Sequence, residues 1–168
     1  MTSTSVSTYT ATRTHTATHL TEVILGSIAG ILADLGLDLG RLSQNWDTYE
    51  TAIKAWIYEG SLATVILECA QPSGANKPII EFPVNYTTAG TGDADFTASH
   101  ARMARFRAKL DLVPSGTTYR LVCTYNKPAS HQPGWSATTR ANTQGLRSIN
   151  FGTVGAAHHA SAGMNYHH

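Results

Sequence analysis

The sequence predicts an α+β fold in which helices pack on one face of a small, mainly antiparallel sheet, with extended segments at both ends. Three stretches carry apolar residues at helical spacing, a hairpin-like pair of apolar runs lies between the second and third of them, and the last quarter is rich in glycine. A chain of 168 residues suits a single domain, because at this size it buries enough surface to be stable.

The first seventeen residues are mostly Thr and Ser, a pattern compatible with an extended strand or with disorder. From Leu20 the apolar residues recur at helical spacing as far as Leu35, and Gly36 follows at a position where helices commonly end. The sequence therefore predicts an extended segment over residues 1–17 and a first helix after it.

Two further helices are predicted. The apolar stripe of the clearer one is formed by Leu42, Trp46, Tyr49, Ile53, Trp56 and Ile57. Gly60 is expected to end this helix. The other is expected over residues 96–113, where acidic residues precede basic ones and Pro114 enforces the stop.

Three strands are predicted for the body. Residues 62–70 and 78–86 form a hairpin, because a loop containing Pro and Gly joins two apolar runs. Residues 117–125 alternate strictly, which indicates a half-buried strand. One face of that strand carries Tyr119, Leu121, Cys123 and Tyr125.

The last quarter of the chain, residues 126–168, contains three basic side chains and no acidic one. Residues 19–125 hold eleven acidic and eight basic side chains, so the formal charges of these two parts are +3 and −3. Its glycines oppose a long helix, while its large apolar residues have no use in a flexible linker. We therefore expect this segment to dock onto the body as a detachable arm.

Composition argues against several functions. With a formal charge of +1 the chain has no strong field for nucleic acid or for an anionic membrane. The basic run Arg102, Arg105, Arg107 and Lys109 is typical of a solvated helix face. No basic region followed by an apolar core opens the sequence, so we expect a soluble, cytoplasmic protein without a membrane segment.

The residue types that carry catalysis are poorly placed. Cys69 and Cys123 lie in apolar, strand-like runs, where a free thiol is inert. Paired histidines at 15/19, 158/159 and 167/168 invite a metal, but a ligand set needs fixed geometry and most of these positions are expected to be mobile. We predict no enzymatic activity, no cofactor and no metal; a hydrolase or nuclease is the residual alternative.

Several segments resemble the bacterial branch of the HORMA-domain family. They are residues 45–56 (NWDTYETAIKAW) followed by Gly60, Leu62 and residues 65–68, together with residues 16–25, the Gly134-Trp135 pair and residues 145–154. The resemblance covers most of the chain and rests on the order and spacing of these segments, because none of them is a catalytic signature.

The resemblance implies a single HORMA-like domain over residues 1–168, with an N-terminal segment (1–17), a body (18–125) and a C-terminal safety belt (126–168). The belt closes over a short peptide that pairs with the edge of the strand at 117–125. The implied peptide-binding residues are Tyr119, Leu121, Cys123 and Tyr125. The implied belt residues are Trp135, Leu146, Ile149, Phe151 and Val154. Trp135 either lines the peptide tunnel or pins the belt to the body.

The resemblance also implies partners and a setting, which is antiphage signalling of the CBASS type. The captured closure peptide comes from a cGAS-like CD-NTase or from a second HORMA-like protein, and its capture supports second-messenger synthesis. An AAA+ remodeller reopens the belt through the N-terminal segment, where Tyr9 and Arg13 form the handle. An alternative from a different class is a structural subunit that assembles by exchanging its Thr-rich start and Gly-rich end as strands.

Overall fold

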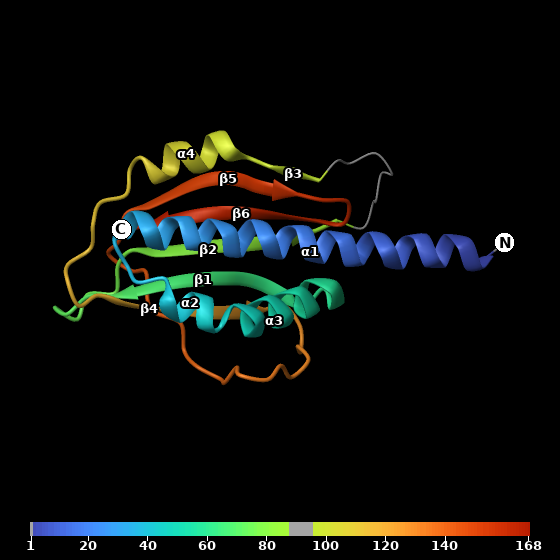
Figure 1. The fold of residues 1–168 in the computed structure, drawn as a ribbon, viewed down its shortest axis with the longest axis horizontal. Helices are drawn as coiled ribbons and strands as arrows, with labels where there is room; N and C mark the ends of the chain where they lie inside the picture. Colours follow the sequence, from blue (N-terminus) through green and yellow to red (C-terminus); the bar gives the residue numbers. More distant parts are fainter. Residues whose placement is uncertain (1, 88–95) are drawn as a thin grey trace.

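The computed structural model describes residues 2–87 and 96–168, which form four helices and six strands (Figure 1). The helices are α1 (Thr2–Leu35), α2 (Gly40–Gln44), α3 (Trp46–Glu59) and α4 (His100–Arg107). The strands are β1 (Leu62–Ala70), β2 (Ile79–Tyr86), β3 (Thr97–Ala98), β4 (Thr118–Tyr125), β5 (Ser148–Ala156) and β6 (Ala160–His167). The predicted α+β class is confirmed.

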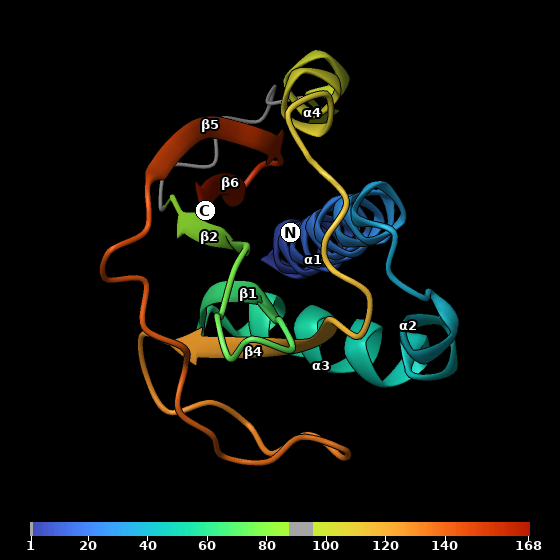
Figure 2. The ribbon, with the colours of Figure 1, turned by 90° about the vertical axis from the view of Figure 1, so that its left-hand side faces the viewer.

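The strands form one antiparallel sheet in the order β3-β5-β6-β2-β1-β4. Seen along α1, the sheet curves around this helix from β4 at one end to β5 at the other (Figure 2). Helix α3 flanks α1 near β4, and α4 flanks it near β5. The helices therefore cover the concave face of the sheet.

Helix α1 supplies the largest part of the core. Its apolar stripe is fully buried at Leu20, Ile24, Leu25, Ile28, Ile31 and Leu32. Residues Thr12–Leu35 are long and apolar enough to cross a membrane by length and composition. In this fold the apolar stripe packs against the sheet and α3, as expected for the central helix of a globular core.

The convex face of the sheet carries a second, smaller apolar cluster. Ile66, Ile79 and Val122 are buried there, and alternation along each strand separates them from the main core. Ala141 and Leu146, from the segment between β4 and β5, pack on this cluster. We call residues 126–147 the crossing loop.

The prediction of an extended start is wrong for residues 2–17, because α1 already begins at Thr2. Arg13 already contacts Tyr58 of α3, and Thr16 and Ala17 are buried against the body. Hydroxyl groups that favour other conformations bond instead to the preceding helical turn: Thr18 Oγ1 donates to the Thr14 carbonyl at 3.0 Å and Thr21 Oγ1 to the Ala17 carbonyl at 2.6 Å.

The other two helices also differ from prediction. The second is divided, because Asn45 has a non-helical backbone between α2 and α3; its end at Gly60, with φ of 76°, is as predicted. The third is shorter than residues 96–113. Thr97 and Ala98 pair with β5 instead, and Phe96 remains 40% exposed.

The tail is only partly an arm. The crossing loop lies outside the sheet, but β5 and β6 form a hairpin whose second strand pairs with β2. Ala160, Ala162, Met164 and Tyr166 alternate toward the core along β6. This period of two is difficult to see in the sequence, because two of its apolar positions are alanine.

Helix α1 gives the first testable expectation. Replacing fully buried Ile28 by Ala removes core contacts and leaves a cavity, so we expect a loss of about 2–5 kcal/mol in the free energy of unfolding. Glu22→Ala, an exposed position on the same helix, should change it by less than about 0.5 kcal/mol. Urea unfolding followed by circular dichroism measures both; equal effects would contradict the central role of α1.

Candidate functional site: the free edge of β4 under the crossing loop

Strand β4 ends the sheet, with β1 on one side and, in the part of the chain that the structure describes, no strand on the other. Along an antiparallel strand the backbone groups of successive residues point alternately to the two sides. The Asn126 N–H donates to the Ser61 carbonyl at 3.0 Å, so the even-numbered residues face β1. Tyr119, Leu121, Cys123 and Tyr125 therefore direct their N–H and C=O groups outward, and we call this side of β4 the free edge.

At one end the crossing loop is held by aromatic residues of α3. The Trp135 ring contacts the rings of Trp56 and Tyr49 edge-on, with centroid distances of 5.1 and 5.7 Å. Trp56 Nε1 donates to the Ser130 carbonyl at 2.8 Å, and the Ser130 N–H donates to Glu59 Oε1 at 2.9 Å. Both side chains and backbone thus fix the start of the loop.

Glycine is required where the loop meets α3. Gly134 has a φ of +85°, which non-glycine residues rarely adopt. A Cβ atom at this position would also lie 2.7 Å from Thr48 Cγ2. The Gly134-Trp135 pair thus combines a close backbone approach with an aromatic anchor.

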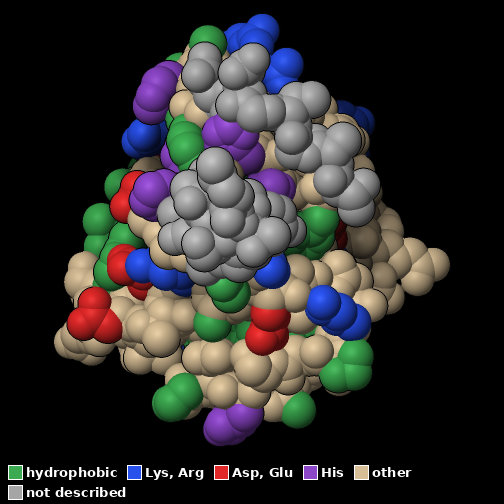
Figure 3. Space-filling model, turned by 90° about the vertical axis from the view of Figure 1, so that its right-hand side faces the viewer, with side chains coloured by type: hydrophobic (Ala, Val, Ile, Leu, Met, Phe, Trp, Pro, Cys, Tyr) green, Lys and Arg blue, Asp and Glu red, His purple; other side chains and the backbone are tan. Residues whose placement is uncertain are grey.

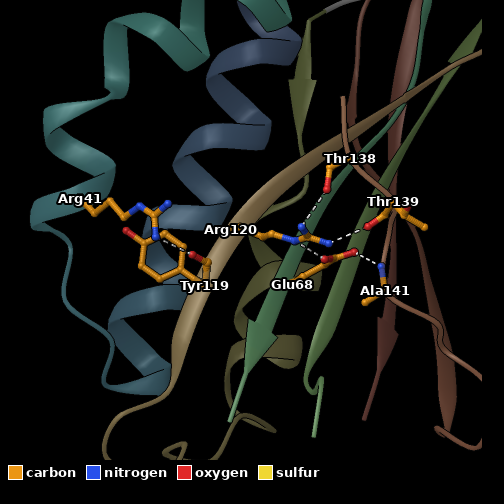
Figure 4. Close-up of polar contacts among 7 residues, drawn as sticks. All are labelled: Arg41, Glu68, Tyr119, Arg120, Thr138, Thr139 and Ala141. Atoms are coloured by element: carbon orange, nitrogen blue, oxygen red, sulfur yellow. Dashed lines mark hydrogen bonds and ion pairs between the residues drawn. The ribbon is translucent and has the colours of Figure 1, made fainter. Parts of the chain in front are cut away.

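At the other end a buried carboxylate holds the loop. Glu68, on β1, is 4% exposed and accepts from Arg120 Nε at 2.7 Å and from the Ala141 N–H at 2.5 Å. The same guanidinium donates to Thr138 Oγ1 at 3.0 Å and to the Thr139 carbonyl at 2.7 Å (Figure 4). Two strands and the loop are therefore joined through one ion pair.

A second carboxylate, Glu81 on β2, pairs with Arg140 of the loop, and His167 Nε2 lies 3.3 Å from its other oxygen. Burial raises the pKa of Glu81, but the hydrogen bonds and charges of Arg140 and His167 outweigh this effect. The pKa of this carboxyl therefore lies below its ordinary value of 4.5.

A cavity of about 520 Å³ lies between the free edge and the crossing loop. Trp56, Cys123, Tyr125, His131 and Trp135 contribute to its wall, which is more apolar than polar. Its size falls within the range of ligand pockets, roughly 300–1,000 Å³. An unpaired strand edge thus borders a half-open, mainly apolar cavity, and a loop anchored at two ends forms its other side.

The structure separates the predicted belt residues into two groups. Trp135 both pins the loop and lines the cavity, and Leu146 packs on the convex cluster. Ile149, Phe151 and Val154 lie in β5, which three strands separate from β4. Sequence reasoning missed Ser130, Thr138, Thr139 and Ala141. The bonds by which Ser130, Thr139 and Ala141 hold the loop use backbone groups, which leave no signal in residue type.

The predicted handle residues lie on α1. The side chain of Tyr9 is outside the described part of the structure. The Arg13 guanidinium donates to the Tyr58 carbonyl and lies 4.7 Å from the centroid of the Tyr58 ring. Arg13 thus attaches the first third of α1 to α3.

The thiols and histidines form no recognisable reactive site. Both cysteines are free, and burial raises the pKa of Cys69 to about 12 and raises that of Cys123 as well, which disfavours the thiolate. Histidines gather on the face at the N-terminal end of α1 (Figure 3). Over the described ranges, no group of three or more His, Cys, Asp or Glu residues could hold a metal ion.

The curved antiparallel sheet around a long helix, with a C-terminal segment that crosses its edge, is a HORMA-type fold. The chain belongs to the family described as Bacterial HORMA domain 2, which matches residues 1–168. No curated protein sequence matches the chain.

Solved structures agree on the fold. A chain of the mitotic checkpoint complex has a TM-score of 0.74 at 11% identity and covers 90% of this chain and 97% of its own. C. elegans HTP-1 bound to the HIM-3 closure motif has a TM-score of 0.67 at 12% identity, and the match covers 88% of this chain and 87% of that one. A chain of the E. coli MS115-1 HORMA:CdnC:Trip13 complex has a TM-score of 0.61 at 13% identity, and the match covers 90% of this chain and 87% of that one.

The aromatic anchor gives a second expectation. Trp135→Ala should lower the free energy of local loop opening by about 1–2 kcal/mol, less than for a fully buried Trp, and should accelerate proteolysis within residues 126–147 about tenfold. The proteolysis rate of Trp135→Phe should lie between those of Trp135→Ala and the wild type. Leu112→Ala, at a 77% exposed position, is the control. Unchanged cleavage of Trp135→Ala would show that the ring does not hold the loop.

The lowered pKa of Glu81 gives a third expectation. Its ionised form contributes stability above pH 4.5, and this contribution is lost as the pH falls through the lower folded-state pKa. Hydrogen exchange of the Arg140 region should therefore differ between wild type and Glu81→Gln at pH 7 and converge on acidification. A difference that persists at pH 3 would argue against the ion pair with Arg140 as its origin.

Proposed function

We propose that the free edge of β4 receives an extended closure peptide as an additional strand, and that the crossing loop closes over it. The observation that carries this proposal is the juxtaposition of outward backbone groups at Leu121, Cys123 and Tyr125 with a half-open cavity beside the crossing loop. Strand addition uses such groups for affinity and side-chain pockets for specificity. The wall formed by Trp56 and Trp135 suits an apolar guest side chain.

In this proposal the protein acts as a non-enzymatic conformational switch. A bound peptide that is flanked on both sides by folded parts of its parent protein leaves only after the loop releases its anchors at Trp135, Glu68 and Glu81. Dissociation is therefore slow compared with what the contact area alone would give.

The guest belongs to a cGAS-like CD-NTase or to a second HORMA-like protein. Its capture supports second-messenger synthesis in antiphage defence, in the cytoplasm. Support comes from the solved structures that pair this fold with a closure motif and with CdnC and Trip13.

Resetting by an AAA+ remodeller begins at α1. The N-terminal end of α1 projects beyond the sheet (Figure 1), which makes it accessible to a pulling machine through the segment that holds Tyr9 and Arg13. Val23 of the same helix packs so closely on β5 that a Cβ atom at Gly155 would lie 2.9 Å from it. Displacing α1 therefore removes support from the β5-β6 hairpin, into which the crossing loop leads.

The alternative of a strand-exchanging structural subunit loses most of its basis. Its premise was two exposed, strand-like ends, but residues 2–17 are helical and β6 is already paired on both sides. A protein that works by peptide capture should remain mainly monomeric without its guest, which light scattering at several concentrations measures.

Strand addition gives a sharp test, because only alternate amides of the guest face β4. Overlapping 15-residue peptides that tile a candidate CD-NTase partner identify a binding segment by fluorescence anisotropy. N-methylation of its amides, one at a time, should then weaken binding tenfold or more at every second position and little between them. Equal effects at all positions, or none, would exclude pairing with the free edge. Trp135→Ala should raise the dissociation rate of the unmodified peptide.

A further inference from the structure

Arg41 closes one end of the free edge. This residue lies on α2, and its Nη1 donates to the carbonyl of Tyr119 at 3.3 Å, on the side of β4 opposite to the Glu68–Arg120 ion pair (Figure 4). The Tyr119 carbonyl is one of the outward groups of β4. A guest strand therefore finds the carbonyls of Leu121 and Cys123 available, but reaches a guanidinium where the next one would be.

Arg41 forms no ion pair in the part of the chain that the structure describes. Across residues 2–87 and 96–168, the ion pairs engage Arg107, Arg120 and Arg140 but not Arg41. The neighbouring carboxylate of Asp38 accepts instead from the Gly40 N–H at 2.9 Å. Arg41 is exposed and uses one of its five donors on a neutral carbonyl, so the others remain for a guest.

Arg41 also faces a cavity of its own. About 430 Å³ lie between Arg41, Tyr119, Arg120 and Ala141, at the opposite end of β4 from the aromatic cavity. The Arg120 guanidinium in this wall is already taken by Glu68 and by the crossing loop. Arg41 therefore sets the sign of charge that this end of the groove prefers.

The register of a guest strand follows from β4. Guest residues opposite Cys123, Leu121 and Tyr119 direct their side chains to the same face as these residues, toward the helices. The first two positions border the cavity lined by Trp56 and Trp135. The third, two residues further along, comes to Arg41.

We infer that the guest peptide carries a carboxylate opposite Tyr119, at the Arg41 end of the groove, two positions beyond a pair of alternating apolar side chains. This inference rests on the proposed capture at the free edge and adds the chemistry by which the groove selects its guest. An arginine binds a carboxylate through two parallel, charge-assisted hydrogen bonds, which favours this group over an amide or a cation. The carboxylate comes from an Asp or Glu side chain or from the C-terminus of the guest.

A displayed peptide library tests the inference. Random nine-residue peptides are presented in two formats, embedded within a scaffold loop and with a free C-terminus, and are selected on the full-length protein. The same selection is made on Arg41→Glu, Arg41→Lys and, as a matched control on exposed α4, Arg105→Ala. Selection of Asp or Glu in the embedded format indicates a side-chain carboxylate. In the format with a free C-terminus, an excess of peptides that end at the selected position indicates a C-terminal carboxylate.

We expect the wild type and Arg105→Ala to enrich a carboxylate two positions beyond the apolar pair, Arg41→Lys to keep this preference more weakly, and Arg41→Glu to replace it by Lys or Arg. An enriched peptide and its carboxylate-to-amide version should differ in affinity by roughly 10-fold to 100-fold on the wild type and bind Arg41→Ala equally.

Two results would overturn the inference in different ways. Enriched apolar pairs without a charge preference, or with one that Arg41→Glu leaves unchanged, refute the role of Arg41 but leave peptide capture standing. Enrichment of no peptide in either format refutes capture at the free edge and the inference with it. Because Arg41 is exposed, its variants should retain the circular dichroism spectrum of the wild type, which verifies that selection reports recognition.

Discussion

The arrangement of the free edge and the crossing loop depends on the satisfied charge of Glu68. A buried carboxylate is costly unless it is paired, and each oxygen of this one has a different partner: Arg120 on the adjacent strand and the Ala141 N–H on the crossing loop. When the loop lifts, only the second contact is lost. The ion pair between the strands remains, so the loop has a strong preference for its closed position without being required for the fold.

The two faces of the sheet differ in how much they contribute to the stability of the fold. The concave face is filled by α1 and α3 and contains nearly all of the large buried side chains. The convex face has only the cluster of Ile66, Ile79 and Val122, on which Ala141 and Leu146 lie. The crossing loop is held by this cluster, by the contacts of Trp135 with α3 and by Glu68 and Glu81, far less than what fills the main core. Local opening of the loop therefore requires less free energy than global unfolding. This separation allows the crossing loop to open and close while the core on the concave face stays folded.

Much of this architecture was accessible from the sequence, and the failures share a cause. Elements with a strong hydrophobic period were predicted correctly, because one face of each is buried. Examples are the helical stripe from Leu20 to Leu35 and the alternation along β4. Tyr119 and its alternating neighbours were placed at an edge by family resemblance, and the structure has them there. Their role in binding stays a prediction.

What escaped prediction depends on contacts between distant segments. The end of the Thr-rich start is helical where Thr16 and Ala17 are buried against the body, and Thr18 donates to the Thr14 carbonyl one turn back. Residues of β5 were assigned to the same function as Trp135, although the sheet order separates them, since sequence proximity does not reveal strand order. The sequence gives no reason to single out Arg41, because it is a lone cation on a short helix. Its significance follows from the hydrogen bond to the Tyr119 carbonyl, which only the structure reveals.

The crossing loop begins at the last residue of β4 and leads into β5, and both strands belong to the same continuous sheet. Together with the sheet, whose strands are joined by hydrogen bonds, it makes a closed hoop, through which the proposed guest would be threaded. A guest with a free terminus can pass through a closed hoop, whereas one flanked by folded domains enters only after the hoop is unfastened. The placement of a recognition sequence within its parent protein, terminal or internal, thus decides whether loading depends on an unfastening step.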